Sequence, residues 1–196
     1  MSRTNLLERR SVVSSLLKDR KDAVVVGGLG ASTYDITAAG DHDRNFYLWG
    51  AMGGAVMIGL GIALAQPELP VVVITGDGEM LMGMGSLATV GLQKPGNLSV
   101  VVLDNEVYGE TGGQASQTGA STDLVGIARC CGIADARALS TMAEIEAFAG
   151  QMQDILGGPR FASVKIDPAN LERVLSHRDG TFILNRLRGA LGYQPI

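Results

Sequence analysis

The chain has 196 residues, of which 46% are hydrophobic and 18% charged, and its formal net charge is -4 at pH 7. This length and composition are typical of one globular domain with a sizeable core, and we expect that domain to span residues 1–196. The acidic balance argues against a nucleic-acid or anionic-membrane partner. The first residues mix charges with short apolar stretches and lack a signal-peptide core, so we expect a cytoplasmic protein.

Two residue types stand out in the composition. Cys130 and Cys131 are adjacent and are the only cysteines. They match neither a metal-binding CxxC pattern nor a disulfide framework, so we expect buried, reduced thiols. The 27 glycines cluster where predicted elements end. Such glycines indicate backbone that closely approaches something else.

The first half of the chain alternates short apolar strands with helical patterns. Aliphatic residues between Leu6 and Leu17 recur at helical spacing, which predicts an amphipathic surface helix. A strand at 23–26 then ends in a glycine loop through Gly30, and Ser32 and Thr33 are candidate caps for a short helix. A brief apolar segment at 45–48 leads to a Gly/Ala-rich helix at 50–66, ended by prolines at 67 and 70. That helix is shorter than the roughly 20 residues of a membrane span.

The second half continues the alternation. We expect strands at 71–75, 98–103 and 161–166, and helices from Glu79, at 123–132, at 141–156 and at 181–191. Thr141 and Glu144 form a candidate capping box. A long polar, glycine-rich loop spans 104–122, and loops of that length are usually functional or mobile. The alternation predicts an α/β fold, a three-layer sandwich whose parallel sheet is covered by helices on both faces.

The segment Gly76-Asp77-Gly78 lies where a buried strand passes into a helix, which is where open α/β sheets bind ligands. Asn105 follows the next strand, so both polar side chains are expected at one edge of a parallel sheet. Carboxylate, amide and backbone oxygens suit Mg²⁺, which takes its remaining ligands from phosphates and water. The flanking glycines and the helix N-terminus let N–H groups approach a phosphate. A divalent cation would remove the repulsion between Asp77 and that phosphate.

These residues resemble the diphosphate-binding motif of thiamine diphosphate enzymes, in which GDG is followed at similar spacing by asparagine. The family's Gly-x-(Met/Leu/Ile)-Gly element resembles the segment from Gly50 to Gly53. The resemblance implies thiamine diphosphate and Mg²⁺ as cofactors, with Met52 forcing a bent coenzyme and the Gly50 carbonyl meeting its 4'-amino group. It implies metal ligation by Asp77, Asn105 and the Val107 carbonyl. The cofactor-binding residues it implies are Gly30, Ser32, Gly50, Met52, Gly76, Asp77, Gly78, Glu79, Asn105, Val107 and Tyr108.

The resemblance covers only the diphosphate-binding half of such enzymes. It implies that a separate alpha subunit carries the pyrimidine-binding domain and the glutamate that activates the coenzyme, so the enzyme is a hetero-oligomer and this chain alone is inactive. Among split enzymes, segments 27–32, 44–65 and 103–114 are similar to the β-type subunit of sulfopyruvate decarboxylase and to phosphonopyruvate decarboxylases. The activity implied is decarboxylation of a small anionic 2-oxoacid, foremost sulfopyruvate to sulfoacetaldehyde and CO2. Gly28 departs from that group, which often has a polar residue there.

Other functions remain open at this point. Phosphonopyruvate decarboxylase, the β subunit of a 2-oxoacid oxidoreductase and an acetolactate synthase-like subunit are alternatives. Two cysteines cannot supply the four ligands of an iron–sulfur cluster, which counts against the oxidoreductase, although another subunit can carry the cluster. The non-enzymatic alternative is a lone module that stores or senses the cofactor.

Several residues have both a functional and an ordinary interpretation. A cation for the substrate's anionic head has candidates in His42, Arg44 and Arg129, or in the partner chain. His42 lies in a charged run typical of a solvated loop. Glu79 either helps to organise the site or is only a favourable charge at a helix start. Met80 and Met84 have the spacing of core residues.

Overall fold

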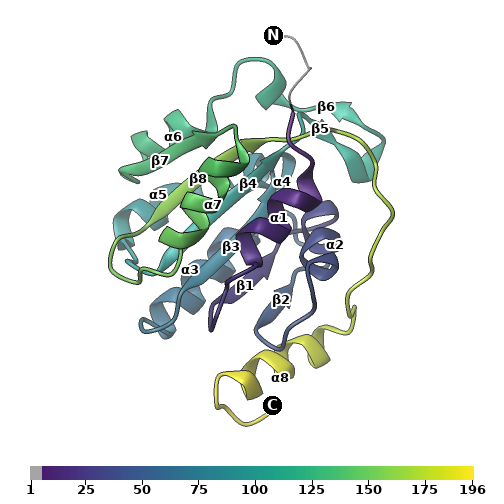
Figure 1. The fold of residues 1–196 in the computed structure, drawn as a ribbon. Coiled ribbons are helices and arrows are strands. Elements are labelled where there is room, and N and C mark those ends of the chain that lie inside the picture. The colour runs from purple at the N-terminus through teal and green to yellow at the C-terminus, as the bar shows by residue number, and fades with distance from the viewer. Residues whose placement is uncertain (1–5) are drawn as a thin grey trace.

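The computed structural model describes residues 6–196 and centres on a parallel sheet (Figure 1). The sheet has six strands in the order β2-β1-β3-β4-β8-β7. Every neighbouring pair in it is parallel. A separate antiparallel pair joins β5 and β6. The strands are β1 (Val24–Gly27), β2 (Asn45–Tyr47), β3 (Val71–Gly76), β4 (Leu98–Asp104), β5 (Val107–Tyr108), β6 (Gln114–Ala115), β7 (Asp135–Leu139) and β8 (Arg160–Lys165).

Helices cover both faces of the sheet, which confirms the predicted three-layer α/β architecture. One core cluster contains Val71 and Val73 of β3, and the other contains Val72 and Ile74, because successive strand side chains point to opposite faces. The first face carries α3 (Ala55–Ala65), α4 (Asp77–Met82), α5 (Ser86–Gln93) and α6 (Leu124–Cys130). The second carries α1 (Arg9–Leu17), α2 (Ala31–Ala38) and α7 (Met142–Gln151), and α8 (Gly180–Ala190) lies beside β2.

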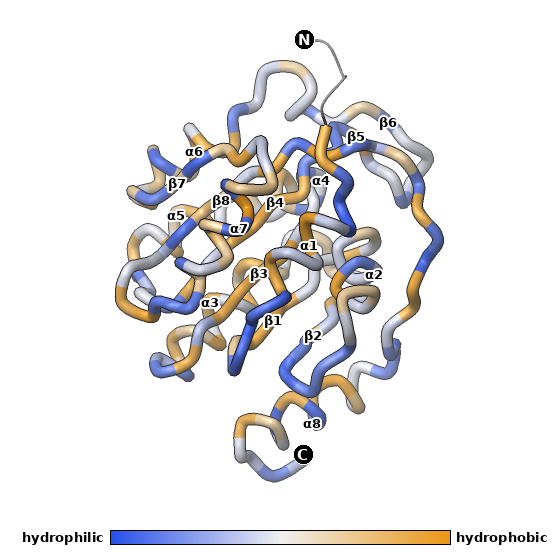
Figure 2. The backbone as a smooth tube through the Cα atoms, viewed as in Figure 1, coloured by the Kyte–Doolittle hydropathy of each residue, from blue (hydrophilic) through white to orange (hydrophobic). Residues whose placement is uncertain are grey.

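The central strands form where the sequence has unbroken β-branched runs. All residues of β1 and β4 are buried, as are the first five of β3. Strands covered on both faces read as continuous apolar runs, and Figure 2 shows this as hydrophobic colour along the middle of the sheet. The edge strand β7 has only two buried residues among five, and its sequence DARAL gives no such run.

Four helices differ from their predicted bounds, and one of these, α7, ends at Gln151 instead of Leu156, with Met152 as its C-cap. The first begins at Arg9 because Glu8 caps it, accepting from the backbone N–H groups of Arg10 and Ser11. The Gly/Ala-rich helix begins at Ala55, since Gly50 and Gly53 have φ values of 96° and 92° that a helix cannot contain. The helix after the GDG turn stops at Met82 and a second helix starts at Ser86. The capping box of Thr141 and Glu144 is present as predicted.

Residues 167–179, which we term the C-terminal strap, run from β8 to α8 without regular secondary structure (Figure 1, right). Arg10 Nη2 donates to the carbonyl oxygen of Glu172 at 2.7 Å. Trp49 Nε1 donates to the carbonyl oxygen of His177 at 2.7 Å. The guanidinium of Arg173 lies 5.5 Å from the ring centroid of Tyr34. Side chains from α1, α2 and the loop before α3 therefore fasten the strap to the body.

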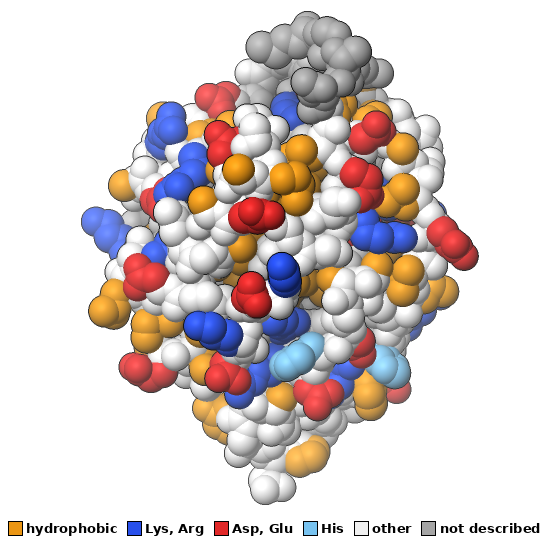
Figure 3. Space-filling model, viewed as in Figure 1, with side chains coloured by type: hydrophobic (Ala, Val, Ile, Leu, Met, Phe, Trp, Pro, Cys, Tyr) orange, Lys and Arg blue, Asp and Glu red, His pale blue; other side chains and the backbone are white. Residues whose placement is uncertain are grey.

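The surface agrees with the acidic, mixed-charge composition. Figure 3 shows basic and acidic side chains interspersed on the face it presents, with both histidines at the surface. Among residues 6–196, no helix combines the length and apolarity required to cross a membrane. Cys130 is exposed and Cys131 half-buried, both as free thiols, so the expectation of buried cysteines is wrong. The inward positions of α6 are taken by Leu124 and Ala128 instead.

Candidate functional site

The carboxyl edge of the sheet holds a cavity of about 970 Å³. Its walls come from the loops that follow β1, β3, β4 and β8, together with the start of α1. This is the position at which open α/β sheets bind ligands. The long 104–122 loop forms one wall through Asn105 and residues 107–113, so the polar loop singled out in the sequence lies at the pocket.

The structure brings most of the predicted cofactor residues to this one pocket. Those that line it are Ser32, Met52, Gly76, Asp77, Gly78, Glu79, Asn105, Val107 and Tyr108. Gly30 and Gly50 do not line it. Gly30 begins α2 with φ 75° and faces Glu110, whose side chain would lie 2.8 Å from an added Cβ. Gly50 is exposed, with φ 96° and nothing within 4 Å of the Cβ position.

Asp77 is the first residue of α4 and is only 2% exposed. Its Oδ2 accepts hydrogen bonds from Ser116 Oγ and, at 3.1 Å, from Thr118 Oγ1. No Lys, Arg or His of residues 6–196 forms an ion pair with it. Burial raises the pKa of Asp77, and the neighbouring charge of Asp104 raises it further.

Asp104, at the end of the adjacent strand β4, is equally buried at 3% but is neutralised. Lys165 Nζ lies 2.8 Å from its Oδ2, and Thr118 Oγ1 donates to its Oδ1 at 2.7 Å. A buried carboxylate without a cation is costly, so the contrast marks Asp77 as the carboxylate that a bound cation would stabilise.

The donors around Asp77 fit a hard cation. Asn105 lies in the same pocket, and its Oδ1 accepts from the N–H of Val107 at 3.1 Å, which fixes the turn between them. Within the described chain no three His, Cys, Asp or Glu side chains converge on a metal-sized site. A metal at Asp77 would therefore take its other ligands from amide, backbone, water or phosphate oxygens, as Mg²⁺ commonly does.

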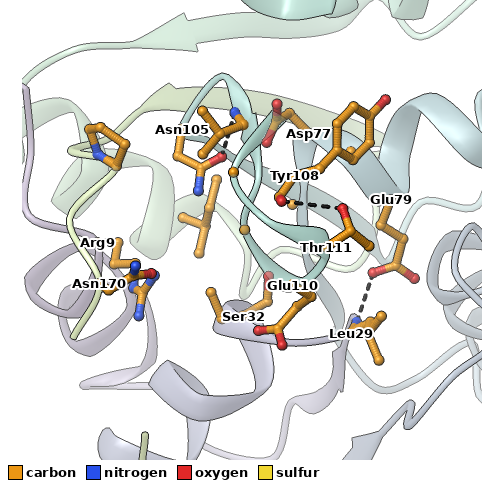
Figure 4. A pocket seen from close by; sticks show the side chains of 18 of the residues that line it. Arg9, Leu29, Ser32, Asp77, Glu79, Asn105, Tyr108, Glu110, Thr111 and Asn170 are labelled. Atoms are coloured by element: carbon orange, nitrogen blue, oxygen red, sulfur yellow. Dashed lines mark hydrogen bonds between the residues drawn. The ribbon is translucent and has the colours of Figure 1, made fainter. Parts of the chain in front are cut away.

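Glu79 connects α4 to the loop after β1. Its side chain is 4% exposed, and its Oε2 accepts from the N–H of Leu29 at 2.9 Å and from Thr75 Oγ1 at 2.8 Å (Figure 4). Its Oε1 has no hydrogen-bond partner among residues 6–196. A Cβ on Gly28 would lie 2.0 Å from Oε2, which explains why a side chain is absent there. Glu79 thus organises the pocket wall and is more than a charge at a helix start.

Two further glycines allow close approaches at the pocket. A Cβ on Gly78 would lie 2.6 Å from the Tyr108 ring, so the aromatic side chain packs directly on the GDG turn. A Cβ on Gly83 would lie 2.2 Å from the carbonyl oxygen of Gly53. The loop that carries Met52 therefore contacts the end of α4 through backbone alone.

The three cations suggested for a substrate head lie elsewhere. Arg44 pairs with Asp22, with Nη1 3.1 Å from Oδ1, and Arg129 donates to the carbonyl of Ala136 at 2.7 Å. Neither they nor the exposed His42 line this pocket.

Of the methionines, Met80 is buried as expected, whereas Met84 is 36% exposed because it follows the break in the helix.

Other residues of the site escaped the sequence analysis. Ser116 and Thr118 do not line the pocket but reach Asp77 from the long loop, and their hydroxyls were the only available signal. Several lining residues come from α1 and the C-terminal strap, whose paths no local pattern encodes: Arg9, Pro168, Asn170, Leu171 and Arg173.

Comparison with known proteins agrees with this geometry. Residues 28–166 match the family model described as thiamine pyrophosphate enzyme, C-terminal TPP binding domain. The chain is 35% identical over 189 residues to the sulfopyruvate decarboxylase subunit beta of Methanothermobacter thermautotrophicus, covering 94% of this chain and 98% of that subunit. It is 42% identical over 154 residues to a phosphonopyruvate decarboxylase of Streptomyces viridochromogenes, covering 78% of this chain.

The chain spans only 38% of that Streptomyces relative. The fold also matches the crystal structure of benzoylformate decarboxylase from Polynucleobacter necessarius, with a TM-score of 0.73 at 19% identity, over 86% of this chain and 34% of that one. From the extent of the family match and the full-length relative, the chain belongs to the thiamine pyrophosphate enzymes, in the family of their C-terminal TPP-binding domain.

Proposed function

We propose that this chain is the beta subunit of a thiamine diphosphate- and Mg²⁺-dependent decarboxylase whose substrate is sulfopyruvate. The observation that carries the proposal is Asp77, a buried carboxylate with no cationic partner among residues 6–196, in a pocket with Asn105 and Val107. The relative matched over nearly its whole length is named for sulfopyruvate decarboxylase, and a second for phosphonopyruvate decarboxylase. Both names describe decarboxylation of a 2-oxoacid with an anionic head.

Each residue of the pocket has a role in this proposal. Asp77, Asn105 and the Val107 carbonyl would hold Mg²⁺, which in turn would bind the diphosphate. Glu79 fixes the loop at Leu29 through a hydrogen bond, so that wall is ordered before ligand binds. Met52 would support the coenzyme from the other side. The coenzyme, when bound, supplies the electron sink that decarboxylation requires.

The other half of the site would come from an alpha subunit that carries the pyrimidine-binding domain and the activating glutamate. The full-length relative is named a beta subunit. On this chain, α3, α4 and α5 each carry exposed apolar side chains, and one of these, Met82, lines the pocket. Their exposed fractions are 44% for Met57, 51% for Leu64, 63% for Met82 and 78% for Leu92. Exposed apolar side chains are a common feature of protein interaction sites.

Calorimetric titration of the full chain with thiamine diphosphate, with and without Mg²⁺, tests the cofactor site. We expect binding only with Mg²⁺, and at least about 100-fold weaker binding by Asp77→Ala, because that change removes the charged metal ligand. Asp123→Ala is the matched control, since Asp123 caps α6 outside the pocket. Unchanged affinity in Asp77→Ala would refute the metal assignment.

Co-expression with the partner chain and a panel of 2-oxoacids tests the reaction. Release of CO2 and aldehyde, fastest with sulfopyruvate and absent for either subunit alone, supports the proposal. Reduction of an added electron acceptor would instead favour the oxidoreductase alternative. Mg²⁺-dependent cofactor binding without turnover in any subunit mixture would favour a lone cofactor-binding module.

A further inference from the structure

Arg9, the first residue of α1, lies at the pocket but plays no part in the cofactor site described above. Its side chain is almost fully buried, with the residue 6% exposed, yet it lines the cavity. In Figure 4, Arg9 and Asn170 are drawn on the side of the pocket opposite Glu79 and Leu29. The pocket thus has a buried cation on the side away from the buried carboxylate of Glu79.

The charge of Arg9 is only partly compensated. Its Nε lies 2.8 Å from Oδ2 of Asp35, a fully buried carboxylate, without forming a hydrogen bond. Arg10 Nε also reaches Asp35, at 3.2 Å from Oδ1. Two guanidinium groups therefore share one carboxylate. The carboxylate of Glu8 also acts on Arg10 and Asp35, but within residues 6–196 it forms no ion pair with Arg9, which is thus only partly compensated.

The two arginines differ in what else they contact. Arg10 Nη2 is occupied by the carbonyl of Glu172 in the strap, and Arg10 does not line the pocket. Arg9 donates no side-chain hydrogen bond to any acceptor in residues 6–196. The unused guanidinium donors are therefore on the cavity side, at Arg9.

Arg173, the other cation at the pocket, is already engaged. Its side chain is 62% exposed and its Nη2 lies 3.4 Å from Oε2 of Glu110. It also lies over the ring of Tyr34. Arg9 is thus the pocket cation, within the described residues, that combines burial with unused hydrogen-bond donors.

We propose that Arg9 binds a tetrahedral oxyanion in this part of the pocket. A guanidinium presents parallel N–H donors that match phosphoryl and sulfonate oxygens, and it stays charged when desolvated. Ser32 and Asn170 add polar side chains to the same pocket, and Ile166, Pro168 and Leu171 add apolar walls that limit water.

Two sources share this chemistry. One is the terminal phosphoryl group of the cofactor diphosphate, and the other is the sulfonate or phosphonate head of the substrate. Naming the cofactor and the substrate as these two sources depends on the proposed function. The oxyanion site itself rests on Arg9, Asp35 and the cavity.

The test compares Arg9→Gln with Arg10→Gln. Each variant removes one of the two positive charges that pair with Asp35, but only Arg9 lines the pocket. Three probes are titrated separately onto the full chain by calorimetry: Mg-pyrophosphate, Mg-thiamine diphosphate and sulfoacetate. We expect Arg9→Gln to weaken at least one probe about tenfold, which is about 1.4 kcal/mol, and Arg10→Gln to change each less than twofold. Arg9→Lys keeps the positive charge but lacks the planar set of paired N–H donors, so its affinity should lie between those of wild type and Arg9→Gln.

The pattern of losses identifies the source. Joint weakening of pyrophosphate and thiamine diphosphate assigns Arg9 to the cofactor, and weakening of sulfoacetate alone assigns it to the substrate head. Wild-type affinity for all three probes in a folded Arg9→Gln or Arg9→Lys variant overturns the proposal, as does equal weakening by Arg10→Gln. If the wild-type chain fails to bind thiamine diphosphate but binds sulfoacetate through Arg9, the oxyanion site stands and the proposed function fails.

Discussion

Buried polar side chains at the two edges of the sheet differ in how completely they are paired. At the amino edge, Asn97 is 4% exposed, and its Nδ2 donates to the carbonyl oxygens of Ala63, Gln66 and Leu69 at 3.1, 3.0 and 2.8 Å. Arg160, also 4% exposed, donates to Asp154 through both Nη atoms. These groups have the partners that burial requires, and they join β3, β4 and β8 to the loops before them.

At the carboxyl edge, several buried charged groups are only partly paired. Asp77 has no cation, Glu79 Oε1 has no donor, and Arg9 shares its carboxylate, all within residues 6–196. Unsatisfied buried groups reduce the stability of a chain and persist where a ligand completes them. Burial alone does not identify a site, and neither does an unmet partner alone, since Ser99 Oγ in β4 and Arg20 Nε before β1 also lack one within residues 6–196. What distinguishes Asp77, Glu79 and Arg9 is that these charged, incompletely partnered groups all line the same cavity. Four substitutions and one matched control test this difference through the free energy of unfolding.

Asn97→Ala should have the largest effect. It removes the donor shared by three carbonyl groups and leaves a small cavity, so we expect a loss of about 3 kcal/mol in the free energy of unfolding, measured by urea denaturation. The affinity for thiamine diphosphate should stay at the wild-type value. A loss below about 1 kcal/mol, or a parallel loss of affinity, would contradict the division between the two edges.

Gly28→Ala should cost less stability and also affect the pocket. The new methyl group would meet Glu79 Oε2 at 2.0 Å and Thr75 Oγ1 at 2.8 Å, displacing the carboxylate from Leu29. We expect a loss of about 2 kcal/mol and weaker cofactor binding, measured by denaturation and titration of the same samples.

Gly150→Ala is the matched control for Gly28→Ala. Gly150 lies inside α7 with nothing within 4 Å of its Cβ position. The substitution there should stabilise the chain by about 0.5–1 kcal/mol and leave cofactor binding unchanged. Equal behaviour of the two glycine variants would show that Gly28 and Glu79 do not constrain each other.

Thr141→Ala should destabilise the chain by about 1 kcal/mol, because Thr141 Oγ1 accepts from the N–H of Glu144 in the capping box of α7. Thermal denaturation gives the effect. Thr141 does not line the pocket, so the cofactor affinity should not change. A change in affinity would show that α7 transmits strain to the pocket.

Asp77→Asn should have the smallest effect on the free energy of unfolding. The informative result is whether the variant is more or less stable than wild type. The pKa of Asp77 is raised by burial, so its contribution to stability is present below the unfolded pKa and is lost as pH rises through the folded one. Without metal, the asparagine variant should therefore be more stable than wild type at pH 7 by less than about 1 kcal/mol. The difference should shrink as the pH falls.

Melting temperatures of both proteins between about pH 4 and pH 7, without metal, measure this difference. The wild type should bind Mg-thiamine diphosphate more weakly as pH falls through the raised pKa, since protonation removes the metal ligand. A stability difference that grows on acidification would show that Asp77 is compensated by a group that its surroundings do not reveal.

The sequence predicted those parts of the fold that local patterns encode. The strands at Val71–Gly76 and Leu98–Asp104 were predicted to within one residue at either end, because burial on both faces makes each an unbroken apolar run. β7 was missed because an edge strand is half exposed and carries Asp135 and Arg137. The helix after the GDG turn was predicted as continuous, since nothing local distinguishes a glycine that ends a helix from one within it.

The candidate site also contains residues that the sequence predicts and residues that it does not. Asp77 and Asn105 follow their strands directly, so topology alone places them at one edge, and the structure puts both in one pocket. Ser116 and Thr118 reach Asp77 from a loop 39 and 41 residues along the chain, and Arg9 comes from a helix before the first strand. Their positions depend on how the loop and α1 pack, which residue order does not express.

The contact between Gly53 and Gly83 has a consequence for the width of the pocket. Because main chain meets main chain there, the Met52 loop and the helix that starts at Asp77 cannot move closer without steric overlap or move apart without losing van der Waals contact. The separation between the pocket wall at Met52 and the pocket wall at Asp77 is thus set by the contact of two backbone segments. The distance between the two walls is therefore fixed for any ligand that spans them, and one methyl group added at either glycine would change it.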